Sequence, residues 1–152
     1  FPYTTLFRSL KYLAVFYDMM RKYQESCKES LGDYSFTPNE TSMMIFMLEH
    51  PEVDTAKEIA VNLGISQSLI CRSVDSLTRK GFLSTEKDKK DRRVNHLTLN
   101  IEDKELEQTL SRMKQNFLDR MTDGVTEDEL NTFQKVVDKM AENIGIRTDR
   151  LG

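Results

Sequence analysis

Residues 64–100 read "GISQSLICRSVDSLTRKGFLSTEKDKKDRRVNHLTLN", and this stretch decides the fold. Gly64 ends an apolar-patterned helix and suits a turn that needs a positive φ angle. Ser66 is a good N-cap for a second helix, whose pattern stops at Gly81. Two helices joined by a short glycine-containing turn are typical of a helix-turn-helix.

A β-hairpin is predicted directly after the second helix. Residues 82–86, "FLSTE", suit a short strand, and residues 87–91 form a polar turn. From Arg93 to Leu99 apolar and polar residues alternate, which predicts a second strand with one buried face. A helix-turn-helix followed at once by a hairpin is a winged helix, so the predicted fold is mainly α with a small β-hairpin.

The second helix has one apolar face, which includes Ile70, Val74 and Leu77, and one short polar face. The polar face is rich in hydrogen-bonding groups and can enter a major groove to read base edges. An ordinary solvated helix face is the alternative interpretation. The residues predicted to read DNA from this helix are Ser66, Gln67, Ser68, Cys71 and Arg72.

Positive charge is concentrated on the hairpin, although the chain has a formal net charge of -3. Between Arg72 and Arg93 lie eight of the 22 Lys and Arg residues but only four of the 25 Asp and Glu residues. A basic stripe on an otherwise acidic protein orients it on DNA, whereas the alternative is a solvated loop. The predicted wing contacts are Lys87, Lys89, Lys90, Arg92 and Arg93, with Asp91 as a brace for the arginine.

Long amphipathic helices flank this central lobe. Apolar residues recur at helical spacing over residues 10–30, 102–123 and 127–145. Capping boxes that start at Thr37, Thr55 and Thr126 predict three further helix starts. The flanking apolar faces are larger than a winged helix can bury, so they favour a second copy as partner. In the alternative, these helices cover one another within a monomer.

Composition and motifs exclude several classes of protein. The 152 residues are 38% hydrophobic and 31% charged, and no apolar run is long enough for a membrane span. Two cysteines without a disulfide framework are consistent with a reducing cytoplasm. The chain lacks the nucleophile, phosphate-loop and dinucleotide motifs of enzymes, so we expect neither catalysis nor a cofactor. Its two histidines lie far apart in sequence, so we predict no metal site.

The first nine residues, "FPYTTLFRS", resemble the translation of a sequencing-library adapter. Pro2 and the Thr4–Thr5 pair are poor helix starters, and a regular amphipathic pattern begins directly after them. We therefore expect residues 1–9 to be a non-native segment and the native start to be missing.

The stretch "TAKEIAVNLGISQSLICRSVDSLTRKGFLSTEKDKKDRRVNHLTLN", residues 55–100, resembles the core of the MarR (multiple antibiotic resistance regulator) family of bacterial transcription factors. The resemblance rests on the Thr-capped helix with Glu-Ile-Ala, the ending "RKGFL" and the Asp91-x-Arg93 wing. It departs from the family at Asn100, where a threonine is usual. Asparagine also caps helices, so we expect little consequence.

The resemblance implies a homodimer on a pseudo-palindromic operator, with repression as the usual outcome. Residues 10–36 and 101–147 would then form the dimerisation helices around a DNA-binding lobe at residues 37–100. Relatives often bind aromatic or lipophilic acids, and methionines and aromatics can line such a pocket. The same methionines could equally be helix core. The candidate pocket residues are Phe16, Tyr17, Met20, Met44, Phe46 and Met47.

Two alternatives to a ligand-responsive regulator are kept. Cys27 or Cys71 could act as a redox-sensing thiol, because oxidation on the reading helix would disturb DNA binding directly. The winged helix could instead serve protein interaction, but that role needs no cationic wing beside aligned Gln67, Ser68 and Arg72.

Overall fold

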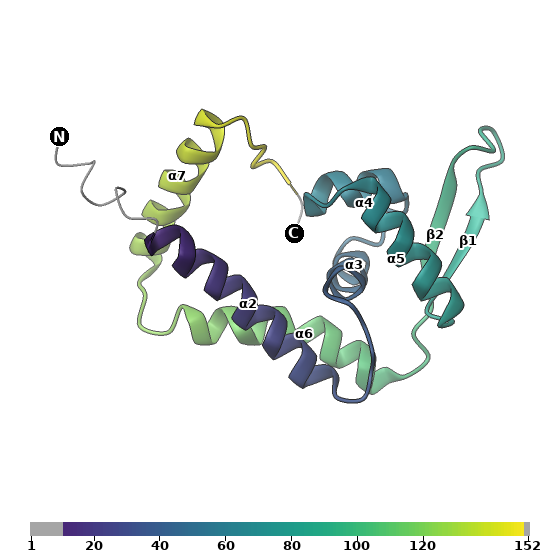
Figure 1. Ribbon diagram of the computed structural model, residues 1–152, viewed down its shortest axis with the longest axis horizontal. Coiled ribbons are helices and arrows are strands. Elements are labelled where there is room, and N and C mark those ends of the chain that lie inside the picture. The colour runs from purple at the N-terminus through teal and green to yellow at the C-terminus, as the bar shows by residue number, and fades with distance from the viewer. Residues whose placement is uncertain (1–10, 151–152) are drawn as a thin grey trace.

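The computed structural model describes residues 11–150, which form six helices and one antiparallel hairpin (Figure 1). The adapter-like segment predicted at residues 1–9 lies outside the described residues. The predicted fold class, mainly α with a small hairpin, is confirmed. The elements are α2 (Lys11–Leu31), α3 (Pro38–Glu49), α4 (Ala56–Leu63), α5 (Gln67–Arg79), β1 (Leu83–Lys87), β2 (Asn95–Leu99), α6 (Lys104–Met121) and α7 (Glu127–Asn143).

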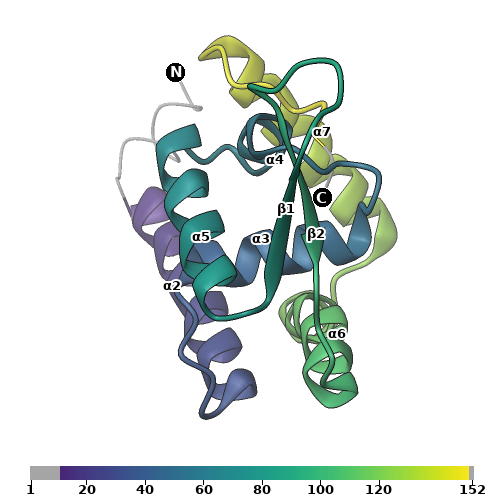
Figure 2. The ribbon, with the colours of Figure 1, turned by 90° about the vertical axis from the view of Figure 1, so that its right-hand side faces the viewer.

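The helix-turn-helix follows the predicted backbone chemistry. Gly64 ends α4 with φ 65°, a left-handed conformation that favours glycine. The Ser66 side chain accepts a hydrogen bond from the backbone N–H of Leu69 and so caps α5. Helix α5 then runs beside β1, so that the hairpin stands next to the second helix (Figure 2).

Two of the three predicted capping boxes are complete, those at Thr37 and Thr126. At Thr55 only half of the box forms, because the Glu58 carboxylate accepts from the Thr55 hydroxyl at 2.6 Å instead of from the backbone N–H. The hydroxyl still accepts from the Glu58 N–H, so α4 keeps its N-terminal cap.

Asn100 does not cap the helix after the wing, contrary to expectation. Its backbone N–H donates to the carbonyl oxygen of Phe82, and its side chain donates to Ser84. It therefore extends the contact between the strand ends. The N-cap of α6 is Asp103, which also accepts a 2.7 Å hydrogen bond from the hydroxyl of Tyr34.

Helix α3 lies at the centre of the lobe, and Met43, Met44 and Phe46 on it are fully buried. Figure 2 shows it behind the hairpin, between α5 and α6. Its apolar residues surround the whole helix, as expected for a helix packed on all sides. The remaining buried hydrophobics come from every described element except α7: Cys27, Leu31, Ile45, Met47, Ile59, Ala60, Ile70, Leu77, Leu83, Leu97, Leu106, Leu110 and Met113.

Helices α2 and α6 run side by side and extend away from the winged helix (Figure 1). The rings of Tyr23 and Phe117 join them with centroids 5.3 Å apart. None of the residues of α7 is buried. The exposed large hydrophobics on and after these helices include Leu13, Phe16, Tyr17, Met20, Met121, Leu130, Phe133, Val136, Val137, Met140 and Ile144.

Within residues 11–150, no helix combines the length and apolarity that crossing a membrane requires.

Candidate functional site

The polar face of α5 points away from the core. Ile70, Ser73 and Leu77 anchor the opposite face, and each is at most 5% exposed. Because these anchors fix the rotation of the helix, the predicted reading residues Ser66, Gln67, Ser68, Cys71 and Arg72 are all exposed.

A groove of about 720 Å³ lies between α4, α5 and the hairpin. Gln67 and Cys71 line it from α5, and Arg93 and Asn95 line it from the wing. The fold therefore brings three predicted site residues from two elements to one groove. The other predicted reading and wing residues do not line it: Ser66, Ser68, Arg72, Lys87, Lys89, Lys90 and Arg92.

Asp91 holds the side chain of Arg93 in a two-pronged ion pair. The Arg93 Nε and Nη2 atoms donate to the two carboxylate oxygens at 3.1 and 3.2 Å, and the backbone N–H of Arg93 donates to the same carboxylate at 3.1 Å. These hydrogen bonds hold the pKa of Asp91 below its usual value. The Arg93 side chain remains 91% exposed, so its guanidinium is oriented but still accessible.

Four further cations surround this pair on the wing: Lys87, Lys89, Lys90 and Arg92, all of them exposed. The wing turn that carries three of them is closed by Asp88, whose Oδ1 accepts from the backbone N–H groups of Lys90 and Asp91 at 2.7 Å each. Such closure by an aspartate keeps a short turn in one conformation.

His96 on β2 was not identified from sequence as a site residue. Its Nδ1–H donates to Asp54 at 2.9 Å, and its Nε2–H donates to Asp88 at 3.0 Å. Hydrogen bonds to Asp88 and Asp54 raise the pKa of His96 to about 9. Bonds from the Asp91 N–H, His96 and the Lys90 N–H lower the pKa of Asp88 to about 2.

No sequence signal pointed to this contact, because Asp54 lies 42 residues from His96. The alternation of β2 shows only that His96 shares the less buried face. Asp54 directly precedes the cap residue Thr55, where a carboxylate suits the start of a helix in any case.

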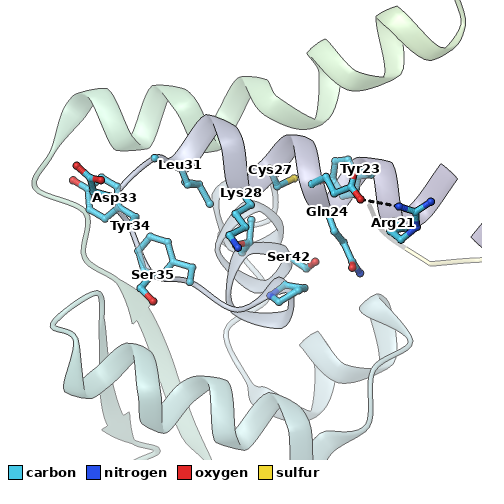
Figure 3. A pocket seen from close by; sticks show the side chains of 15 residues that line it. Arg21, Tyr23, Gln24, Cys27, Lys28, Leu31, Asp33, Tyr34, Ser35 and Ser42 are labelled. Carbon is cyan, nitrogen blue, oxygen red and sulfur yellow. Dashed lines mark hydrogen bonds and ion pairs between the residues drawn. The ribbon is translucent and has the colours of Figure 1, made fainter. Parts of the chain in front are cut away.

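A second hollow, of about 570 Å³, lies between α2 and α3 (Figure 3). Tyr23, Cys27, Lys28 and Leu31 line it from α2, and Ser42 lines it from α3 (Figure 3). Its lining mixes aromatic, cationic and apolar groups and continues along the connecting segment through Asp33, Tyr34, Ser35 and Phe36.

The six residues predicted for a ligand pocket do not line this hollow. Phe16, Tyr17 and Met20 lie exposed on the first half of α2. The three predicted pocket residues on α3 are instead part of the core: Met44, Phe46 and Met47, at most 6% exposed. Their methionine and aromatic character grouped them, but α3 is enclosed by its own lobe, so Met44, Phe46 and Met47 face the core.

The two cysteines lie in different surroundings. Cys27 is buried beside Tyr23, and this burial raises the pKa of its thiol, which disfavours the reactive thiolate. Cys71 is exposed in the groove between α5 and the wing. Over the described part of the chain, no His, Cys, Asp and Glu cluster has the arrangement of a metal site.

Part of the chain matches a known family model. Residues 34–94 match the model of the MarR family. The transcriptional regulator AdcR of Streptococcus pneumoniae is 41% identical over 54 residues, which cover 36% of this chain and 37% of AdcR.

Two solved structures share the fold over most of both chains. The S. aureus MepR–DNA complex superposes with a TM-score of 0.73 at 15% identity and covers 87% of this chain and 97% of MepR. PcaV from Streptomyces coelicolor, solved with its natural ligand, superposes with a TM-score of 0.67 at 16% identity. The match covers 84% of this chain and 89% of PcaV.

Proposed function

From the match of residues 34–94 to the model of the MarR family, we propose that the protein is a sequence-specific, DNA-binding transcriptional regulator. The observation that carries the proposal is the groove in which Gln67 and Cys71 of α5 face Arg93 of the wing. One element can enter a major groove while the other reaches the flanking backbone.

Helix α5 is the reading element in this proposal. Its exposed face combines the amide of Gln67, the hydroxyl of Ser68 and the guanidinium of Arg72, which suit adenine and guanine edges. Its anchored face fixes the helix rotation, so the same side chains meet the duplex each time. We expect loss of these residues to relax base preference.

The wing grips the duplex beside the reading site. Arg93 is accessible and aimed by Asp91, so it can enter a narrow A·T-rich minor groove where negative potential is concentrated. The exposed lysines Lys87, Lys89 and Lys90, with Arg92, suit phosphate contacts that raise affinity without sequence preference.

We propose that the protein works as a homodimer through residues 10–36 and 101–147, with residues 37–100 as the DNA-binding lobe. The exposed apolar side chains of α2 and α7, such as Phe16 and Phe133, form a face that a second copy can cover. A two-fold dimer presents two α5 helices about 34 Å apart to an inverted repeat. The alternative of a monomer leaves this face in water.

A small effector is the proposed regulator, and repression the proposed outcome. The hollow between α2 and α3 joins the platform helix to the segment that leads into the lobe, and PcaV, a structural neighbour, was solved with its natural ligand. Lys28 in its lining favours an acidic ligand, whereas Arg21 is already paired with Asp18 and Glu25, and Tyr23 and Tyr34 favour an aromatic one. We propose accordingly that the protein acts in the cytoplasm, where its DNA target lies, and that its role is binding and not catalysis.

A thiol-based switch is a second candidate, favoured by one observation. Cys71 is exposed in the same groove as Gln67, so an oxidised or alkylated thiol would collide with a bound duplex. Cys27 is buried and does not share this exposure.

The experiment is fluorescence anisotropy with a duplex from upstream of the protein's own gene and a random duplex of equal length, across a salt series. We expect tighter binding to the upstream duplex and a linear fall of log affinity with log salt. The matched control Arg112→Ala, on α6, should bind as wild type does, whereas Arg72→Ala should lose the preference. Binding to neither duplex would favour a protein-interaction module, and loss of binding on peroxide treatment that Cys71→Ser prevents would favour the thiol switch.

A further inference from the structure

A continuous chain of hydrogen bonds leads from the start of α4 to the guanidinium on the wing. It begins at Asp54, whose backbone oxygen accepts from Leu97 N–H at 2.7 Å and whose carboxylate accepts from His96. His96 then donates to Asp88, and Asp88 closes the turn that contains Asp91.

The chain ends at Arg93, which Asp91 holds by two side-chain hydrogen bonds. Among the described residues, the His96 side chain joins the Asp54 segment before α4 to Asp88 in the wing turn. Two strands of five residues are a flexible element by themselves, because a lone hairpin is marginally stable in water.

We propose that His96 is a positioning residue for the DNA interface: it ties the wing turn, through Asp88, to the Asp54 segment before α4. By this tie it sets where Arg93 and the wing lysines meet the duplex. The inference rests on the proposed DNA-binding function. It goes beyond that function because it assigns the wing's position to a residue that does not itself touch DNA.

The surroundings of His96 make the tie depend on protonation. The groups that face it are carboxylates: Asp54 from the segment before α4, Asp88 from the turn, and Glu86 at the paired position on β1. A protonated imidazole donates to both aspartates, but a neutral one donates through a single nitrogen and must release one of them. Because the pKa is raised to about 9, the tie is intact at neutral pH and is lost as pH rises through about 9, while its contribution to stability is full below the ordinary value of 6.5.

The test compares wild type with His96→Gln and Asp54→Asn on a random duplex at low salt, where wing contacts dominate. We expect His96→Gln to bind roughly tenfold more weakly near neutral pH, as when one or two wing contacts are lost. Wild-type affinity should fall between about pH 8 and 9.5. The fall should be absent in His96→Gln and should move to lower pH in Asp54→Asn, which keeps the backbone bond to Leu97.

The matched control is His50→Gln, which changes the other histidine of the chain and should keep the wild-type pH profile. A second variant, Arg93→Ala, tests whether His96 acts through Arg93. In the His96→Gln background, Arg93→Ala should weaken binding by less than it does in the wild-type protein. Equal affinity and equal pH profiles for wild type and His96→Gln would overturn the proposal. Wild type that binds no DNA would instead overturn the proposed function. If circular dichroism shows that His96→Gln is unfolded, Asp54→Asn tests the proposal instead. Its affinity should then fall at a lower pH than that of wild type, and an unchanged pH profile would overturn the proposal.

Discussion

Replacing Lys80 with methionine tests how the reading helix is fastened to the core. Lys80 is the C-cap residue of α5, and its Nζ lies 2.8 Å from Oε2 of Glu40 and 2.7 Å from the carbonyl oxygen of Ser35. The ammonium also lies 5.4 Å from the ring centroid of Phe36. Methionine keeps an unbranched apolar side chain of nearly the same length, but it removes the ammonium and its charge.

The expected destabilisation follows from the burial of the two partners. The Glu40 side chain is 3% exposed, so Lys80→Met leaves a buried carboxylate without its cation, which costs about 3–5 kcal/mol for a fully buried pair. The Lys80 side chain is 35% exposed, so water replaces part of the lost contact. We therefore expect the free energy of unfolding to fall by about 2 kcal/mol near neutral pH.

The pH dependence identifies the mechanism. Burial opposes ionisation of Glu40, but hydrogen bonds from Lys80, Ser76 and the backbone of Thr37 outweigh it, so its pKa lies below the usual value. This stabilisation is present above the usual carboxylate pKa and is lost as pH falls through the folded value. Without the Lys80 ammonium, the effect of burial prevails and the pKa of Glu40 rises, so the difference in stability from wild type should shrink toward about pH 5.

Urea denaturation at one fixed protein concentration, at about pH 7 and pH 5, measures both effects. The control Lys57→Met removes an exposed cation on α4 and should change stability by less than about 0.5 kcal/mol. A similarly small loss for Lys80→Met would mean that water solvates Glu40 fully. An equal loss at both pH values would refute the role of the ionised carboxylate.

Three further predictions concern DNA binding and assembly. Arg72→Ala should weaken binding to the operator by about 1–3 kcal/mol and binding to random DNA much less; equal losses on both duplexes would reassign Arg72 to phosphate contact. Lys89→Ala should make the slope of log affinity against log salt less steep by about one unit and leave base preference unchanged, as measured by anisotropy. Arg93→Ala should weaken binding most on operators with A·T-rich flanks, measured in the same way. Phe133→Glu, in the exposed face of α7, should convert a dimer to a monomer in sedimentation at micromolar concentration, and a wild-type monomer there would contradict the assembly.

Local chemistry predicted much of this molecule from sequence. The caps at Thr37, Ser66 and Thr126 and the left-handed turn at Gly64 are set by residues within three or four positions, so spacing alone revealed them. The Asp91–Arg93 pair is equally local, two residues apart.

Contacts between distant segments could not be read in the same way. Lys80 and Glu40 are 40 residues apart, and the partners of His96 lie on two other segments. The methionines of α3 allowed two interpretations, a pocket wall or helix core, and they are buried in the core, as an apolar run around a whole helix indicates.

The absence of buried residues on α7 has a genetic consequence under the proposed assembly. A subunit with damaged α5 but intact α2 and α7 would still pair with a healthy one, and each mixed pair would hold a single working reading helix. Half-operator binding is far weaker than binding to both halves. Alleles that damage α5 should therefore be dominant over the wild-type gene, whereas alleles that disrupt the apolar face of α7 should be recessive, because their products never enter a mixed pair.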